Sequence, residues 1–300
     1  MLGRSFAEQI AAATEESSTF IANRPALAAT LQDLTLFGNQ VILESVPSDF
    51  DSLGKIGYFP FTEASTEFSY SLNLALGGAY KPAYLCLRSY LELALVGLHF
   101  LALPAADHSG LRWLRSKDPT PFRGAIVKAL RGDKRFTTAA QRLGFFERLD
   151  ELYGCLSNQT HTRGEKHGHI ATSKGNFPRF VQEALEKYVT QLWKVSALIA
   201  TGFAILRPVV LVPLPLDEKF GLNGPLSGFL QDFEVEVVRS FLPQEHVEWL
   251  EARSAVDEEA VSAKAWVESL SDLTHEDWDR QVRRQQQWFN GMTLPRERDY

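Results

Sequence analysis

Apolar residues recur at three- and four-residue spacing through the first two thirds of the chain, and this spacing predicts a bundle of helices. Residues 6–21 and 26–43 follow it, with Pro25 in the first turn of the second segment, where proline is tolerated. Residues 80–103 are apolar nearly all round, which is typical of a helix at the centre of a bundle, and Pro104 ends the segment. The predicted fold class is therefore all-α.

Shorter patterns complete the expected core. The spacing predicts further helices over residues 61–76, 124–130, 137–143, 143–162 and 178–206. Residues 55–60, Lys-Ile-Gly-Tyr-Phe-Pro, are predicted to be a connection because glycine and proline weaken a helix interior. Residues 163–176, rich in glycine and histidine, are predicted to form a loop.

The composition changes after the last of these helices, and we place a domain boundary there. Pro208 and Pro215 flank residues 209–214 and Pro213 interrupts them, so this extended segment fits an edge strand or a linker. Three helices are predicted at 243–252, 257–270 and 274–289, whereas residues 233–238 suit a strand or a helix. The expected organisation is a helical bundle core at 1–207, a linker containing proline and glycine at 208–224, and a smaller acidic helical appendage at 225–300. Its tryptophans are expected to dock it on the core: Trp249, Trp266, Trp278 and Trp288.

Charge is unevenly distributed along the chain, although the formal net charge is only −6. Residues 112–148 hold ten Lys or Arg against three acidic residues, whereas residues 232–279 hold fourteen Asp or Glu against three basic residues. The basic region is either a solvated helix face or a site for a polyanion. The net charge argues against a uniformly basic coat for nucleic acid.

Cysteine content and hydropathy indicate a cytoplasmic protein. Cys86 and Cys155 lie in apolar helical patterns and imply no disulfide framework. The N-terminal segment lacks the long apolar core of a secretion signal. The apolar run 195–206 is shorter than the roughly 20 residues that a membrane span requires, so we expect a buried core helix and no membrane partner.

Candidate chemistry begins with polar residues on two of the predicted helices. Tyr153, Ser157 and His161 recur every four positions and therefore share one helix face. On the central helix, Arg88 and Glu92 are also four apart and can pair. Two apolar helices that each carry polar groups must align them or leave buried groups unpaired. We therefore predict that the two helices pack together and bring these five side chains close to one another.

A second cluster follows His161 directly. Residues 161–169 contain three histidines, His161, His167 and His169, together with Arg163. A histidine acts as a general acid or base near neutral pH, and an adjacent cation offsets the negative charge that develops in phosphodiester chemistry. Three histidines also satisfy the ligand count of a catalytic zinc site, but the four-residue pair on a helix face is missing. No metal and no other cofactor is therefore predicted.

The helical core, the Arg88-Ser-Tyr-Leu-Glu92 helix and the Leu156-Ser157-x-x-x-His161 helix end resemble the HEPN superfamily and related bacterial helical proteins, over about residues 60–207. Many HEPN proteins carry an Arg-x4-6-His motif, and Arg163 and His169 have that spacing, with Gly164 following the arginine. In the alternative alignment His161 is the motif histidine. The motif arginine then falls on Leu156, and Arg88 from the neighbouring helix has to replace it in space.

The resemblance implies a homo-oligomeric helical protein directed at RNA. It implies a metal-independent ribonuclease of a bacterial stress or phage-defence system. His161 or His169 is then the acid–base group, and Arg163 or Arg88 binds phosphate. Two alternatives remain open: a non-catalytic interaction module in which these residues form a structural polar network, and a helical protein that binds a small ligand or a metal.

Overall fold

The computed structural model describes residues 5–47, 52–104, 106–161, 163–169, 171, 174–175, 177–223 and 228–291. Every regular element in these ranges is helical, so the all-α prediction is confirmed. The α-helices of the first two thirds are α1 (Phe6–Ala22), α2 (Pro25–Leu36), α3 (Ile42–Glu44), α4 (Ser52–Leu76), α5 (Tyr80–Ala102), α6 (Ser109–Leu114), α7 (Arg123–Gly132), α8 (Lys134–Leu143), α9 (Phe145–Thr160) and α11 (Gln182–Leu206). The later ones are α12 (Leu216–Phe220), α13 (Asp232–Ser240), α14 (Gln244–Ser254), α15 (Glu258–Ser269) and α16 (His275–Gly291).

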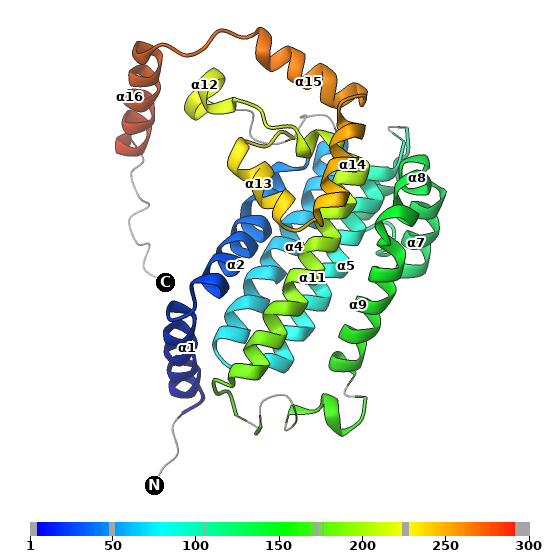
Figure 1. Cartoon of the computed structure of the whole chain (residues 1–300), viewed down its shortest axis with the longest axis vertical. Coiled ribbons are helices and arrows are strands. Elements are labelled where there is room, and N and C mark those ends of the chain that lie inside the picture. Colours follow the sequence, from blue (N-terminus) through cyan, green and yellow to red (C-terminus); the bar gives the residue numbers. More distant parts are fainter. Residues whose placement is uncertain are drawn as a thin grey trace.

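The centre of the molecule is the bundle of α4, α5 and α11, which stand side by side with α9 along one flank (Figure 1). Close packing explains their contact: the rings of Phe61 on α4 and Phe203 on α11 lie 4.8 Å apart. At Gly97 of α5 a Cβ atom would lie 2.5 Å from the ring of Phe61 on α4, so only glycine lets α5 approach α4 this closely. The predicted central helix is thus confirmed.

The segment 55–60 is not the connection that its composition predicts. Helix α4 begins at Ser52 and continues through Pro60 to Leu76. Phe61 and Phe68 on this helix are fully buried, and α4 packs along α5 more extensively than any other described pair of helices does. Tertiary packing therefore outweighs the local cost of proline inside a helix.

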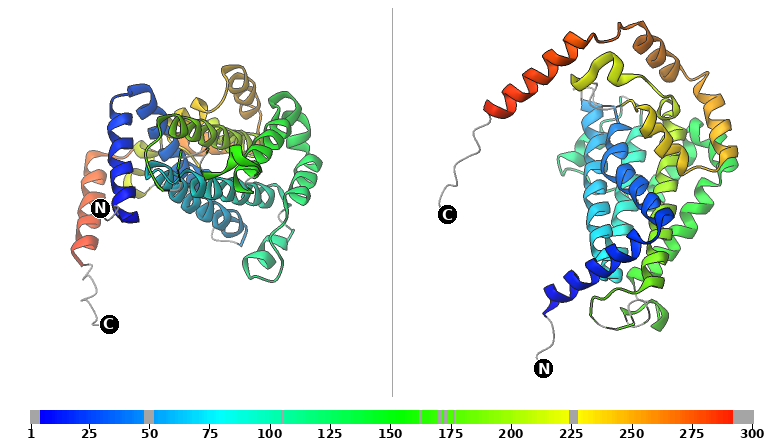
Figure 2. Two further views of the ribbon diagram at one scale, coloured as in Figure 1. Left: turned by 90° about the horizontal axis from the view of Figure 1, so that it is seen from below. Right: turned by 60° about the vertical axis from the view of Figure 1, so that its left-hand side comes forward.

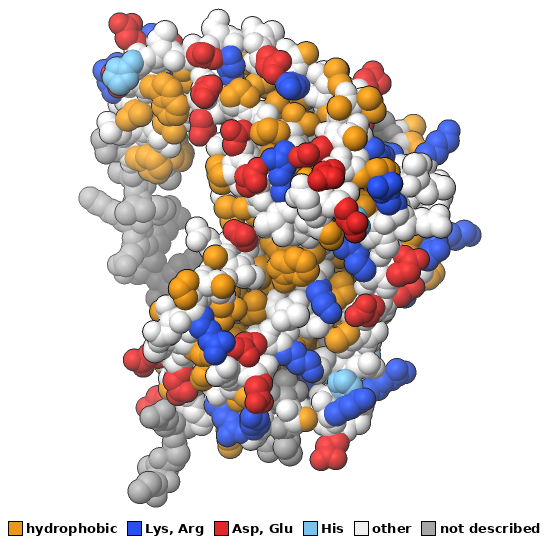
Figure 3. All heavy atoms as spheres, in the orientation of Figure 1, with side chains coloured by type: hydrophobic (Ala, Val, Ile, Leu, Met, Phe, Trp, Pro, Cys, Tyr) orange, Lys and Arg blue, Asp and Glu red, His pale blue; other side chains and the backbone are white. Residues whose placement is uncertain are grey.

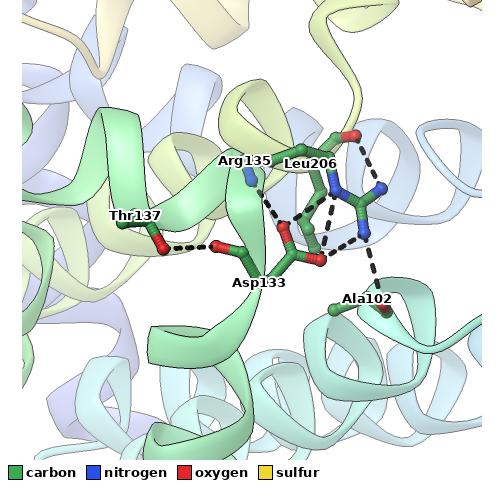
Figure 4. A network of polar contacts seen from close by, with 5 residues as sticks. All are labelled: Ala102, Asp133, Arg135, Thr137 and Leu206. Atoms are coloured by element: carbon green, nitrogen blue, oxygen red, sulfur yellow. Dashed lines mark hydrogen bonds and ion pairs between the residues drawn. The ribbon is translucent and has the colours of Figure 1, made fainter.

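The basic region forms α6, α7 and α8 on the flank of the bundle, and the interval between the helices predicted at 124–130 and 137–143 narrows to the single residue Asp133. The Asp133 carboxylate caps α8 by accepting a hydrogen bond from the main-chain nitrogen of Arg135 at 2.7 Å. The Arg135 guanidinium reaches the carbonyls of Ala102 and Leu206, at the ends of α5 and α11 (Figure 4). Gly144, with φ of 58°, then makes the turn into α9 that a side chain would strain.

Residues on both sides of the predicted boundary at 208–224 contribute to the main hydrophobic core. The segment that the sequence predicts to be extended instead forms a 3₁₀ turn (Pro208–Leu211). The turn is buried because it packs against α11, α14 and α15. Helices α13 and α14 share the main hydrophobic core through Val235, Val238, Phe241 and Leu250. Residues 233–238, which suited a strand or a helix by sequence, therefore form part of helix α13. Among the described helices, α12, α15 and α16 contribute no residue to this core, and α12 and α15 pack in smaller apolar clusters.

A buried polar cluster, which we call the Arg207 cluster, joins α13 and α15 to the bundle. It comprises Arg207, the carbonyls of Ser45 and Gly228 and the carboxylate of Glu259, and a separate pair of carboxyls, Glu44 and Glu234, links α3 to α13. Arg207 donates to both carbonyls and to Glu259. Glu234 is fully buried and accepts from Gln40 at 2.8 Å. Burial, together with the hydrogen bond and charge of Glu234, raises the pKa of Glu44 to about 8.

Acidic side chains gather over the C-terminal helices at the top of Figure 3, as the charge pattern predicts. The tryptophans differ in their packing. Trp249 packs against the main core and Trp266 contacts Phe220 and Phe229, whereas Trp288 is 61% exposed. Helix α16 extends away from the bundle (Figure 2), so Trp288 does not dock it as predicted.

Within the described part of the chain, α5 and α11 are long and apolar enough to cross a membrane. Buried residues make up 50% of the apolar window in α5 and 78% in α11. The run 195–206 is buried throughout, as expected of a core helix.

Candidate functional site

The polar residues of α5 and α9 meet where the two helices pack. Buried leucines on one face of α9, Leu149, Leu152 and Leu156, face the core and leave its polar residues beside α5. Arg88 lies at this junction and donates to four side chains: to Glu92 Oε1 at 2.9 Å, Tyr153 Oη at 2.8 Å, Thr160 Oγ1 at 2.9 Å and His161 Nε2 at 3.0 Å. We call Arg88, Glu92, Tyr153, Thr160 and His161 the Arg88 cluster.

His161 is positioned by the end of its helix. Its main-chain nitrogen caps α9 by donating to the Ser157 carbonyl at 3.0 Å, and the Thr160 hydroxyl donates to the same carbonyl at 3.1 Å. Because the guanidinium of Arg88 can only donate, His161 Nε2 accepts with its lone pair and the ring hydrogen lies on Nδ1. The contact therefore defines which ring nitrogen of this exposed residue accepts from Arg88.

Two cations flank the ring of Tyr153. The guanidinium carbon of Arg88 lies 4.8 Å from the ring centroid, and that of Arg123 on α7 lies 4.6 Å from it. Arg123 also pairs with Asp150 on α9. Helix α7 is thereby fixed against the Arg88 cluster, and the basic region borders it.

The charge of Arg88 is secured by its surroundings. Partial burial acts to lower the pKa of this guanidinium, but the hydrogen bond and charge of Glu92 outweigh burial and raise the pKa above its ordinary value. The side chain of Arg88 is 19% exposed and that of Glu92 is 43% exposed. The cluster thus combines a permanent positive charge with an imidazole and two hydroxyl groups at the protein surface.

The predicted alignment of the two helices is confirmed for four of the five residues: Arg88 contacts Glu92, Tyr153 and His161 directly. Ser157 takes part through its main-chain carbonyl. Thr162, the last residue of the predicted helix, lies outside the described residues.

Of the two loop candidates, His169 lies apart from this cluster, whereas Arg163 follows His161 by two residues. Arg163 is exposed, and its main-chain nitrogen donates to the Asn158 carbonyl at 3.2 Å. His169 lines a small pocket together with Tyr80 in the first turn of α5. Tyr80 and Arg88 are eight residues apart on one helix, about 12 Å along its axis. The contact with Arg88 therefore belongs to the alignment that uses His161.

The three histidines of the loop do not form a metal site. Among the described residues, which include all three, no group of three or more His, Cys, Asp or Glu side chains is placed to hold a metal ion. His167 lies in the 3₁₀ turn Glu165–His167, where burial and the charges of Lys166 and Lys187 lower its pKa. His161 is instead engaged by Arg88.

Two members of the site were missing from the residues predicted by sequence. Thr160 lies seven residues after Tyr153 and therefore on the same face of the helix, but it does not belong to the four-residue series of Tyr153, Ser157 and His161. Arg123 carried no comparable signal, because it comes from a third helix whose approach depends on the tertiary fold.

A pocket of about 360 Å³ opens beside the cluster, between α5 and α7. Glu92 and Tyr153 line it and also contact Arg88. Chemically, the cluster and pocket offer a fixed cation, an imidazole and an adjoining cavity for a small organic group.

No known family model matches this chain, and neither a curated protein nor a solved structure is detectably similar to it.

Proposed function

We propose that this chain is an RNA-directed HEPN-like protein that cleaves RNA without a metal, in a bacterial stress or phage-defence system. His161 is the acid–base group, and Arg88 and Arg163 provide positive charge for the phosphate. The observation that supports this most is the 3.0 Å contact between Arg88 and His161, which joins an arginine and a histidine 73 residues apart in sequence. It gives the His161 alignment an arginine in space, where the motif position in the sequence holds Leu156.

The proposed reaction is attack of a ribose 2′-hydroxyl on the adjacent phosphate. A bond forms between the 2′-oxygen and phosphorus, and the bond from phosphorus to the 5′-oxygen breaks. His161 accepts the proton of the 2′-hydroxyl, and the leaving 5′-oxygen takes up a proton from solvent. The products are a 2′,3′-cyclic phosphate and a 5′-hydroxyl end.

Substrate binding has to release the lone pair of His161, which accepts from Arg88 in the free protein. A phosphate oxygen is a better acceptor for a guanidinium than a neutral imidazole is, because hydrogen bonds between charged groups are shorter and stronger. The hydrogen bond donated by Arg88 Nη1 therefore switches from His161 Nε2 to a phosphate oxygen when RNA binds. His161 Nε2 is then free to take the proton, next to the cation that stabilises the developing charge.

The basic surface beside the site supports a polyanionic substrate. Arg115, Lys117, Lys128 and Arg131 are exposed, and Arg123 connects α7 to Tyr153 of the cluster. Phosphate contacts of this kind release counterions, so RNA affinity should fall as salt rises. The resemblance also implies a homo-oligomer, which light scattering on the purified chain would measure.

The test is cleavage of a single-stranded RNA of mixed sequence in the presence of EDTA, with the wild type and single alanine variants. General acid–base catalysis contributes about 10²–10⁴-fold, so His161→Ala should lower the rate by at least 100-fold. Arg163→Ala should also lower the rate and weaken RNA binding. His169→Ala separates the two alignments: full activity supports His161, and a loss like that of His161→Ala supports the Arg163–His169 pair.

Two controls make the result decisive. Circular dichroism and urea unfolding of each variant check that the fold is retained. End-group analysis should find a 2′,3′-cyclic phosphate. A wild type that neither binds nor cleaves RNA at any salt concentration contradicts the proposal.

One observation favours a second candidate, a non-catalytic interaction module. Arg88 uses four of its five N–H donors within the protein, as a residue does in a structural network. In that case His161→Ala and Arg88→Ala lower stability, and no RNA cleavage is found in any variant.

A further inference from the structure

The pocket beside the Arg88 cluster is bounded by two helices and by the segment before α7. Leu93 and Val96 of α5 and Ile126 of α7 supply apolar surface, and Thr120 and Phe122 lie on the side of α7. Its volume of about 360 Å³ is in the range of small-ligand sites, which begins near 300 Å³. One nucleotide-sized group fits such a space, whereas a folded domain does not.

The pocket and the Arg88 cluster share a wall. Tyr153 lines the pocket, and its hydroxyl accepts the hydrogen bond of Arg88 at 2.8 Å. Glu92 also lines the pocket and accepts from Arg88 Nε at 2.9 Å. A group in the pocket therefore lies next to the residues that handle the phosphate in the proposed function, on which this inference rests.

The chemistry of the walls suits a flat, hydrogen-bonding ring. The side chain of Phe122 is 74% exposed at the pocket, so its face is free for stacking, and base–aromatic stacking is tolerant of base identity. Arg123, also at the pocket, is already paired with Asp150 and stacked on Tyr153. Apolar walls and one aromatic ring would hold a nucleobase.

Selectivity comes from Glu92, whose carboxylate is the acidic group at the pocket. One of its oxygens accepts from Arg88, and a carboxylate has further lone pairs for other donors. Guanine presents two adjacent donors on its Watson–Crick edge, the ring N1–H and the exocyclic amino group. Uracil presents one donor between two carbonyl acceptors, which a carboxylate repels.

We propose that this pocket binds an unpaired guanine base of single-stranded RNA, with Glu92 accepting hydrogen bonds from its edge, Phe122 stacking on its face, and the adjoining phosphate at the Arg88 cluster. The pocket thus adds a base preference to a site that would otherwise act on any RNA phosphate.

The test uses 2′,3′-cyclic GMP and 2′,3′-cyclic UMP, which cannot undergo the proposed transesterification again, titrated into the full chain by isothermal calorimetry. The wild type should bind the guanine nucleotide about tenfold more tightly than the uracil nucleotide, a difference of about 1.4 kcal/mol in binding free energy. Glu92→Gln keeps an acceptor for Arg88 but replaces one acceptor oxygen by a donor, and should abolish the difference. Phe122→Ala should weaken both nucleotides, each by roughly tenfold.

Phe289→Ala is the matched control, because this phenylalanine is 58% exposed on α16 and is not part of the pocket. It should leave both affinities unchanged. Equal affinity of the wild type for the two nucleotides, or binding of neither, overturns the guanine pocket even if RNA is cleaved in EDTA. A guanine preference without any RNA cleavage supports the pocket and removes the ribonuclease. The two proposals therefore fail by separate measurements.

Discussion

Two arginines in this protein organise polar clusters, and they do so with different kinds of partner. Arg207 has a side chain only 7% exposed and donates to main-chain carbonyls of two segments and to Glu259. Arg88 has a side chain 19% exposed, and the four partners of its guanidinium described above are all side chains.

The difference lies in what the partners can do. A buried main-chain carbonyl requires a hydrogen-bond donor, and Arg207 supplies it. Arg207 thereby joins three parts of the chain: the end of α3, the segment that precedes α13, and helix α15. The partners of Arg88 include an imidazole, a carboxylate and a phenol, which are groups that bind ligands and move protons. The Arg88 cluster also borders a pocket, whereas Arg207 is enclosed.

The largest stability effect is expected at the structural arginine. Arg207→Ala leaves the buried carbonyls of Ser45 and Gly228 without their donor, and unsatisfied buried groups cost about 1–3 kcal/mol each. We expect the free energy of unfolding to fall by about 3 kcal/mol in urea titrations. The control is Arg24→Ala, which breaks an exposed ion pair with Glu186 and should cost less than about 0.5 kcal/mol. Similar losses in both variants would contradict a structural role of Arg207.

A smaller stability loss is expected at the Arg88 cluster. Arg88→Ala removes four contacts, but Glu92 is 43% exposed and His161 is exposed, so water replaces part of the lost hydrogen bonding. We expect about 1–2 kcal/mol less stability in the same urea titrations. Arg88→Lys retains the charge without the planar set of donors and should recover only part of the loss. If Arg88→Ala unfolds the protein more readily than Arg207→Ala, the ranking of the two clusters is wrong.

The smallest effect concerns pH and the Glu44–Glu234 pair, which links α3 to α13. Because burial raises the pKa of Glu44 from 4.5 to about 8, the folded protein holds this proton in a pH range where the unfolded chain loses it. Stability therefore falls as pH rises through that window. Glu44→Gln keeps a neutral hydrogen-bonding group, so it should be more stable than the wild type by about 1 kcal/mol at pH 8, after allowance for solvent screening.

The measurement is the difference in unfolding free energy between wild type and Glu44→Gln at pH values from 4 to 8, which removes the contribution of groups that titrate in both proteins. The difference should grow steadily with pH. A difference that is constant across this range shows that Glu44 is not held protonated.

The helices of the core were predictable because their signals are local. Apolar spacing placed α5, α9 and α11 within a few residues of their observed ends, and it separated α7 from α8. The failures share one cause. Pro60 and residues 208–214 carry local signals against a helix or a packed segment, but burial against neighbouring elements outweighs them.

The sequence determined by itself that the chain is a helical bundle with a basic middle and an acidic end, and that Tyr153 and His161 share one face of α9. Periodicity and charge are properties of neighbouring residues, so they survive without knowledge of the fold. Only the tertiary structure decided that Arg88 reaches His161, that Arg123 covers Tyr153 and that a pocket opens beside Glu92. These contacts join three helices, and their geometry depends on how the helices pack rather than on any one segment.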